Sequence, residues 1–263
     1  MSAPPGWTED LFLKQGDLFL KLHERGLEHS EEEAKAIAGL LKKHGLTEGG
    51  SILDAPCGIG RHAIHLARMG YRVSGIDLSP LYIERANHFR EKMNLQDHLE
   101  LKVGDLRKVG EAFRSRQYDA AINMWQSLGY WDEETDLSIL TQFHDLTTDK
   151  GLFVVDVLNR DNLVKYMTNF GLTRFEDGTE QHEMRRLNYE TSELELVWQF
   201  YNREGNDLKH RSIAKVRFCV YALHELRDLL RRAGWKSLEE FGSFALEPVS
   251  AEKKRLIAVA SKA

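Results

Sequence analysis

SILDAPCGIGRHAIHLARMGYRVSGIDLSP, residues 51–80, is the stretch that decides the fold. It predicts a short strand at 51–54, a turn with two glycines, a helix, and a second strand at 71–77 that ends in Asp77. Gly70 is placed to end the helix, and Pro80 suits the first position of the next one. This order is typical of one half of a parallel sheet that binds a nucleotide at the carboxyl ends of its strands.

The alternation of strand and helix continues along the chain, with one interruption. Further strands are predicted at 101–105, 120–125 and 151–158, where the alternation indicates a parallel sheet, and again at 237–241 and 254–261. The interruption, at about 187–220, holds two β-type runs, LELVWQFYNR and HRSIAKVRFCVY, joined by the turn EGND, and predicts an antiparallel lobe. Before the sheet, residues 8–44 have helical periodicity, with Ser30 expected to cap a second helix that ends at Gly45.

Composition limits the classes of function. A chain of 263 residues with 42% hydrophobic residues can form one large domain with an inserted lobe. The net charge of −5 argues against a broad phosphate-binding face, so nucleic acid is not expected as a partner. Cys57 and Cys219 stand alone, which predicts no disulfide framework and no metal site. Residues 1–7 lack the features of a signal peptide and no stretch is long enough to span a membrane, so we expect a cytoplasmic protein without membrane contact.

The glycine turn poses a choice between two nucleotides. Residues 58–63 fit the G-x-G-x-x-G/A pattern of dinucleotide sites, with Asp77 at a suitable distance for a ribose hydroxyl. Asp54 precedes the glycines, and its carboxylate would oppose a pyrophosphate at the helix N-terminus. S-adenosylmethionine has no phosphate, and its ammonium and sulfonium charges favour a nearby carboxylate. Asp105, at the end of the third strand, suits its adenine amino group.

Together these features resemble the class I, seven-stranded, Rossmann-like S-adenosylmethionine-dependent methyltransferases. The matching motifs are LDAPCGIG (53–60), VSGIDLSP (73–80), VGDL (103–106) and AAINMWQSLGYW (120–131). The resemblance implies an α/β fold: a seven-stranded, mostly parallel, doubly wound sheet with an antiparallel last strand, N-terminal helices and an inserted antiparallel β lobe. It implies S-adenosyl-L-methionine as cofactor, S-adenosyl-L-homocysteine as product, and cofactor contacts from Asp54, Gly58, Gly60, Asp77, Leu78, Asp105, Leu106 and Asn123. Arg61 is expected to pair with the cofactor carboxylate or with a neighbouring acid.

The acceptor is less defined by sequence. Residues 123–126, Asn-Met-Trp-Gln, depart from the Asn-Pro-Pro-aromatic motif of enzymes that methylate nucleobase or glutamine amide nitrogens. The position of the β lobe between the fifth strand and the last helix resembles glycine/sarcosine N-methyltransferase-like enzymes. We expect an N-terminal helical cap at 1–47, a methyltransferase core at 48–160 and 221–263, and an inserted lobe at 161–220. The lobe is expected to be a lid, a substrate-binding element or a dimer contact. Tyr130 and Tyr221 are the candidate catalytic residues. The lobe residues offered to an acidic metabolite are Arg185, Arg186, Tyr189, Arg211 and Arg217, while Trp7, Phe12 and Phe19 are expected to close the other side of the pocket.

We therefore predict a methyltransferase that acts on a nitrogen or oxygen of a small molecule. The alternatives are an RNA or protein methyltransferase, a non-catalytic S-adenosylmethionine-binding protein and, more distantly, a dinucleotide oxidoreductase. A homodimer is a further alternative for the use of the lobe.

Overall fold

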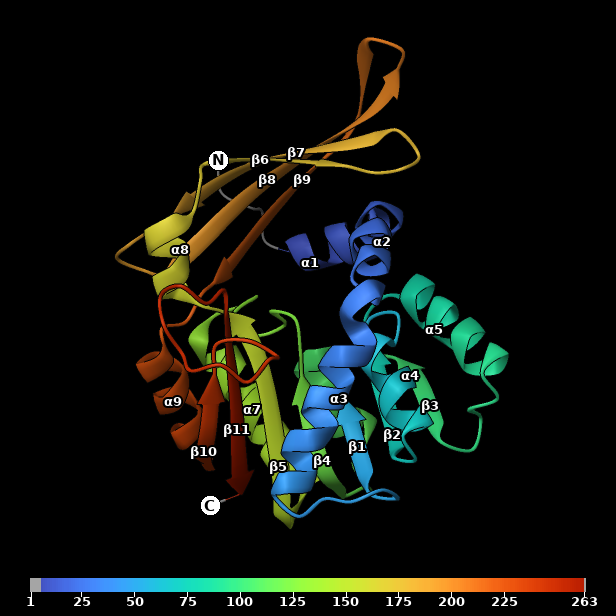
Figure 1. The fold of residues 1–263 in the computed structure, drawn as a ribbon, viewed down its shortest axis with the longest axis vertical. Coiled ribbons are helices and arrows are strands. Elements are labelled where there is room, and N and C mark those ends of the chain that lie inside the picture. Colours follow the sequence, from blue (N-terminus) through green and yellow to red (C-terminus); the bar gives the residue numbers. More distant parts are fainter. Residues whose placement is uncertain (1–5, 263) are drawn as a thin grey trace.

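The computed structural model describes residues 6–262, and within them the first sheet has seven strands in the order β10-β11-β5-β4-β1-β2-β3 (Figure 1). These strands are β1 (Ser51–Asp54), β2 (Arg72–Asp77), β3 (Leu99–Val103), β4 (Tyr118–Asn123), β5 (Thr147–Leu158), β10 (Trp235–Phe241) and β11 (Arg255–Lys262). Neighbours among β1 to β5 pair in parallel, whereas β11 is antiparallel to both β5 and β10. The predicted mostly parallel sheet with an antiparallel last strand is confirmed.

Helices cover both faces of this sheet, as a doubly wound fold requires. One face carries α3 (Leu27–Lys43), α4 (Arg61–Arg68) and α5 (Pro80–Lys92), and the other carries α6 (Val109–Ala112), α7 (Glu133–Leu146) and α9 (Leu223–Arg232). Successive strand residues point to opposite faces. Ile52 and Val154 accordingly pack in the first core, while Leu53 and Val155 pack in the second.

A second sheet forms the inserted lobe, which stands apart from the first sheet in Figure 1. After α8 (Arg160–Tyr166), it is an antiparallel meander of β6 (Phe170–Arg174), β7 (Thr179–Leu187), β8 (Glu193–Glu204) and β9 (Asp207–Cys219). The two predicted runs are β8 and β9. The sequence analysis missed β6 and β7, because their charged and half-exposed residues carry no clear apolar alternation.

The N-terminal segment lies between the second sheet and the carboxyl ends of the first (Figure 1). It comprises α1 (Trp7–Glu9), the π-helical turn η1 (Asp10–Lys14) and α2 (Gly16–Arg25). Its apolar side chains, such as Leu11 and Phe19, pack against Leu196 and Phe218 of the lobe in a third core. The prediction that Ser30 caps a helix is wrong, because α3 begins at Leu27 and the Ser30 hydroxyl donates to the Leu27 carbonyl at 2.8 Å.

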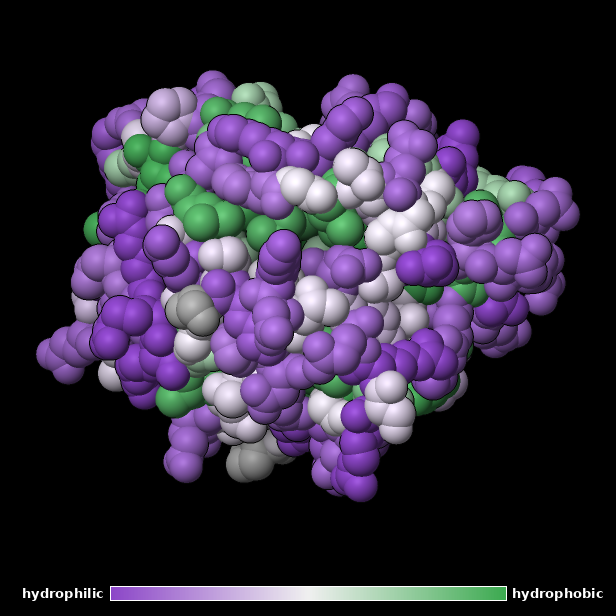
Figure 2. All heavy atoms as spheres, turned by 90° about the horizontal axis from the view of Figure 1, so that it is seen from below, coloured by the Kyte–Doolittle hydropathy of each residue, from purple (hydrophilic) through white to green (hydrophobic). Residues whose placement is uncertain are grey.

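The surface opposite the lobe is largely hydrophilic, with an apolar band of limited width (Figure 2). Within residues 6–262, none of the helices combines the length and the apolar composition needed to cross a bilayer. The expectation about a signal peptide concerns mainly residues 1–5, which lie outside the described residues.

Candidate active site

Asp77 organises the glycine turn after β1. Its Oδ2 accepts the Gly58 N–H at 2.9 Å, and its Oδ1 accepts the Ser79 N–H at 2.9 Å. Gly58 has a φ of +54°, in the left-handed region, and an added Cβ would lie 3.0 Å from Cε1 of His23. Burial raises the pKa of Asp77 to about 6, against these two hydrogen bonds. Each carboxylate oxygen keeps a further lone pair for a ligand.

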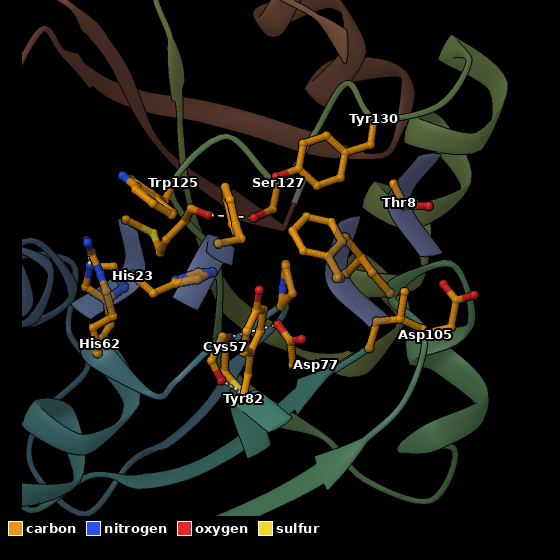
Figure 3. Close-up of a pocket in the computed structure, with 18 of the residues that line it drawn as sticks. Thr8, His23, Cys57, His62, Asp77, Tyr82, Asp105, Trp125, Ser127 and Tyr130 are labelled. Carbon is orange, nitrogen blue, oxygen red and sulfur yellow. Dashed lines mark hydrogen bonds between the residues drawn. The ribbon is translucent and has the colours of Figure 1, made fainter. Parts of the chain in front are cut away.

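A cavity of about 740 Å³, part of it open to solvent, lies at the carboxyl ends of β1 to β4. Trp125, Ser127 and Tyr130 form one side in Figure 3, with Asp77 and Tyr82 on the other side. The lining residues are Thr8, Phe12, Phe19, His23, Pro56, Cys57, Gly58, Arg61, His62, Asp77, Leu78, Tyr82, Asp105, Leu106, Met124, Trp125, Ser127, Tyr130 and Trp131. This is the edge at which open α/β sheets bind ligands.

Five of the eight expected cofactor residues line this cavity, namely Gly58, Asp77, Leu78, Asp105 and Leu106. The other three support it from behind. Gly60 has a φ of +79°, and an added Cβ would lie 3.1 Å from Cδ1 of Ile64 and 3.2 Å from Cβ of Ala86, so a side chain there would be strained. Asn123 is fully buried and donates from Nδ2 to the Ala55 carbonyl at 2.8 Å, which ties β4 to the turn after β1.

Asp54 is also buried outside the cavity wall, and its charge is not freely available. Neither of its carboxylate oxygens has a hydrogen-bond partner within residues 6–262. Burial raises the pKa of Asp54 to about 8, and the neighbouring Asp77 adds to that shift. The carboxyl group is therefore mostly protonated at neutral pH until a cation binds close to it. The sequence-based expectation of a negatively charged Asp54 that opposes a pyrophosphate thus does not hold for the unliganded protein.

Asp105 lies at the other end of the cavity and is held by one arginine. Its carboxylate accepts the Arg107 backbone N–H at 2.9 Å and the Arg107 guanidinium at 2.6 to 3.0 Å. Although burial acts in the opposite direction, the hydrogen bonds with Arg107 lower the pKa of Asp105. The same guanidinium lies 5.1 Å from the ring centre of Trp131. Asp105 thus stays ionised and its position is fixed.

A strained turn after β4 places Trp125 in the wall. Trp125 and Gln126 have φ values of +61° and +62°, which are rare for residues with side chains. The Trp125 N–H donates to Oδ2 of Asp156 at 3.0 Å, and the Gln126 N–H donates to the Asp156 carbonyl at 3.1 Å. The Gln126 side chain donates to the Leu128 carbonyl at 2.8 Å. These bonds hold a conformation that the chain would otherwise avoid.

A second cavity adjoins the first beneath β8 and β9. It measures about 1240 Å³, including space open to solvent. Phe12, Phe19, Trp125 and Tyr130 line both cavities, so these four side chains form a wall that the two spaces share.

The two candidate catalytic tyrosines lie in different places. Tyr130 lines both cavities, and burial raises its pKa well above the ordinary value, so its hydroxyl stays protonated. Tyr221 lines neither: it packs in the core between the sheet, α7 and α9, and its hydroxyl donates to Asp136. The expected catalytic role of Tyr221 does not fit this placement, because a buried structural hydrogen bond occupies its hydroxyl.

His23 is a site residue that the sequence analysis missed. It is 8% exposed and lies within 4.9 Å, between ring centres, of Phe19, Tyr82 and Trp125. Its Nδ1 has no hydrogen-bond partner within residues 6–262. Burial, together with the Arg61 guanidinium, lowers the pKa of His23 to about 3, so the imidazole is neutral. No periodicity distinguishes His23 from other polar residues of α2.

Arg61 was expected to pair with the cofactor carboxylate or with a neighbouring acid, and in the structure it pairs with an acid, Glu33. Its guanidinium also lies 5.2 Å from the ring centre of Trp125. This stacking adds a further support to the wall between the cavities.

These residues fit S-adenosylmethionine. The free lone pairs of Asp77 suit two ribose hydroxyls, the missing side chain of Gly58 leaves room for close approach, and the unpaired Nδ1 of His23 remains for a polar atom of a ligand. When bound, the cofactor supplies a methyl group already activated on a sulfonium. The protein then has to align the acceptor and exclude water.

Comparison with known proteins agrees with this geometry. The model of a methyltransferase domain family matches residues 52–151. A protein of Geobacillus sp. (strain WCH70) named as a methyltransferase is 27% identical over 84% of this chain and 88% of its own length. The glycine/sarcosine N-methyltransferase of Parasynechococcus marenigrum (strain WH8102) is 29% identical over 52% of this chain and 46% of its own length. The matches to curated relatives cover from 18% to 88% of the relative's length.

Solved structures resemble the whole fold. The CcbJ methyltransferase from Streptomyces caelestis has a TM-score of 0.77 at 19% identity and covers 89% of this chain and 90% of its own. The sugar N-methyltransferase KedS8 from Streptoalloteichus sp. ATCC 53650 has a TM-score of 0.66 at 16% identity, with 90% and 91% covered. At these identities the likeness establishes the fold alone.

Proposed function

We propose that this chain, which belongs to the class I S-adenosylmethionine-dependent methyltransferases, transfers a methyl group to a nitrogen or oxygen atom of a small-molecule acceptor. The single observation that carries the proposal is the close neighbourhood of two cavities, which share Phe12, Phe19, Trp125 and Tyr130 as a common wall. The first cavity has the residues for the cofactor. The second, covered by β8 and β9 and partly open to solvent, offers a place for an acceptor of limited size.

The proposed cofactor residues are those on the cavity wall. Asp77 accepts from the ribose hydroxyls, Gly58 allows close approach, and Leu78, Asp105 and Leu106 surround the adenine end. Gly60 and Asn123 act indirectly, since they hold the turn and the strand ends in place, and Asp54 lies buried behind the cavity wall.

Tyr130 is proposed to orient the acceptor. Since its hydroxyl remains protonated, it can donate a hydrogen bond but cannot serve as a base at neutral pH. A neutral amine needs no base before transfer, because its lone pair is already free. A hydroxyl acceptor would have to lose its proton to another group. The proposed acceptor atom is therefore a nitrogen or an oxygen.

The lobe favours a small molecule over a polymer. β8 and β9 contribute Leu196, Trp198, Val216 and Phe218 to the wall of the second cavity, so a folded RNA or protein would have to enter beneath a sheet. The net charge of −5 also disfavours RNA. We propose that the lobe, residues 161–220, covers the acceptor. A cytoplasmic location and a homodimer remain proposals, and light scattering coupled to size exclusion measures the latter.

The test uses methyl-labelled S-adenosylmethionine and an extract separated into small molecules, RNA and protein. Label that appears in an organic small molecule supports the proposal. Label in RNA or protein would establish the corresponding alternative. Binding of the cofactor without any labelled product, over a range of extracts, would favour the non-catalytic binding protein.

A further inference from the structure

We infer that the acceptor is a bulky, mainly apolar molecule with at least one ring and a hydrogen-bond-accepting oxygen, bound in the cavity beneath β8 and β9. This inference rests on the proposed function and specifies its substrate class. It differs from the acidic metabolite expected from the lobe arginines.

The wall of this cavity is dominated by ring side chains. They come from the N-terminal segment, from the loop after β4 and from the lobe, and include Trp7, Phe12, Phe19, Tyr130, Trp198 and Phe218. Phe19 and Trp198 stack at 5.5 Å with an interplanar angle of 16°, and the Tyr130 ring lies 6.0 Å from Phe12 and 6.1 Å from Phe218. Faces and edges of this kind pack well against a planar ring.

The charged groups near the cavity are not arranged for a small acid. Arg255 lines the cavity, but its Nε donates to Asp156 at 2.6 Å. Arg25, Glu28 and His29 are exposed and have mixed charge. A buried carboxylate ligand would need an uncommitted cation in the wall to offset its desolvation.

The arginines of the lobe lie elsewhere. None of Arg185, Arg186, Arg211 and Arg217 lines this cavity, and each has an acidic partner: Glu183 at 2.6 Å, Glu195 at 4.0 Å, Asp17 at 2.7 Å and Glu193 at 3.6 Å, respectively. Arg186 and Arg217 lie opposite Glu195, on the other face of the sheet from Leu196, whereas Arg185 lies opposite Leu196 but is paired with Glu183.

One polar group in the apolar wall lacks a partner. Trp198 is 7% exposed, lines the cavity, and its indole Nε1 makes no hydrogen bond within residues 6–262. A buried N–H without a partner costs free energy, so an oxygen on the ligand would be stabilised there. Gln126, another polar side chain of this wall, already bonds to the Leu128 carbonyl and to the Leu158 N–H. Trp198 thus adds specificity for an oxygen-bearing ring.

The experiment titrates 1-naphthol and, separately, glycine into the full-length protein, with and without saturating S-adenosylhomocysteine. Naphthol is expected to bind and glycine is not. Trp198→Phe keeps the ring but removes the N–H, and one neutral hydrogen bond corresponds to a loss of about 2- to 10-fold in naphthol affinity. Leu196→Lys, which places a charge on the cavity side of β8, is expected to abolish naphthol binding.

Val197→Lys is the matched control, because Val197 precedes Trp198 on β8 and does not line the cavity. It should leave naphthol affinity unchanged, and S-adenosylhomocysteine affinity should be the same in all variants. Glycine binding as tight as naphthol binding would overturn the inference. So would unchanged naphthol affinity in both Trp198→Phe and Leu196→Lys. Failure of S-adenosylhomocysteine to bind would instead refute the proposed function, while the naphthol titration without it still reports on the cavity.

Discussion

Asp77→Asn tests the cofactor assignment most directly. In the protein each carboxylate oxygen accepts one backbone N–H at 2.9 Å, which leaves two lone pairs for ribose hydroxyls. The amide of Asn offers one acceptor oxygen, and its NH₂ group would face either a backbone N–H or a hydroxyl. At least one hydrogen bond to a charged acceptor is lost. Such bonds contribute about 1.5–3 kcal/mol, so we expect the affinity for S-adenosylmethionine to fall by about 10- to 150-fold.

Isothermal titration calorimetry with S-adenosylmethionine, S-adenosylhomocysteine and NAD provides the measurement. The first two should bind the wild type and NAD should not. Asp119→Asn is the matched control, since Asp119 also accepts a backbone N–H, from Ser51 at 2.8 Å, but sits at the start of β4, at the opposite edge of the sheet. Its cofactor affinity should stay within about twofold. A change of less than threefold in Asp77→Asn, or preferential binding of NAD, would refute the assignment.

Three further predictions follow from the geometry. Gly58→Ala should lower the free energy of unfolding by about 1–2 kcal/mol in a denaturant titration, because a left-handed φ is unfavourable for a residue with a Cβ. The added Cβ would also lie 3.0 Å from Cε1 of His23, and combining the change with His23→Ala should relieve only this steric part. Tyr221→Phe removes the hydrogen bond to Asp136, so it should lower the melting temperature by several degrees and keep turnover within about twofold. Tyr130→Phe changes the cavity wall, so it should lower turnover with little change in melting temperature. The reverse result would restore Tyr221 to the active site. The pKa of Asp54 is about 8 in the folded protein and 3.8 for an ordinary aspartic acid side chain in water. Between pH 3.8 and pH 8 the folded state therefore holds a proton that the unfolded state has lost. The melting temperature of the unliganded protein should thus fall as the pH rises from 6 to 9. Asp54→Asn should flatten that profile, and also abolish proton release on S-adenosylmethionine binding at pH 7, measured as a dependence of the binding enthalpy on buffer; equal pH profiles for both proteins would contradict this.

The sequence predicts the sheet well because its strands are buried on both faces. Such strands appear as short continuous apolar runs, and helices of ordinary length separate them. β1 matches its predicted bounds, 51–54, at both ends. Asp77 and Asp105 could also be placed near one another, since residues that follow parallel strands gather at one edge.

The rest of the site depends on contacts between distant segments. His23 lies on α2 and becomes a site residue only because α2 packs over Gly58, about 35 residues further on. Tyr221 was misplaced for the converse reason: its position just before a helix suggested the active-site edge, yet its ring turns into the core to reach Asp136. A single sequence contains no signal for either orientation.

The wall between the cavities explains why the acceptor class could not be predicted from any one motif. Trp125 is held in a left-handed conformation by Asp156 of β5, while the Gln126 amide also reaches the Cys219 carbonyl at the end of β9, 3.3 Å away. The turn therefore joins the cofactor-binding core to the lobe, and Phe19 of the N-terminal segment packs against it from a third direction, with ring centres 6.0 Å apart. Each segment alone has an ordinary amphipathic pattern. Only their convergence creates an apolar slot beside the cofactor cavity, so the chemistry of the acceptor is a property of the assembled fold.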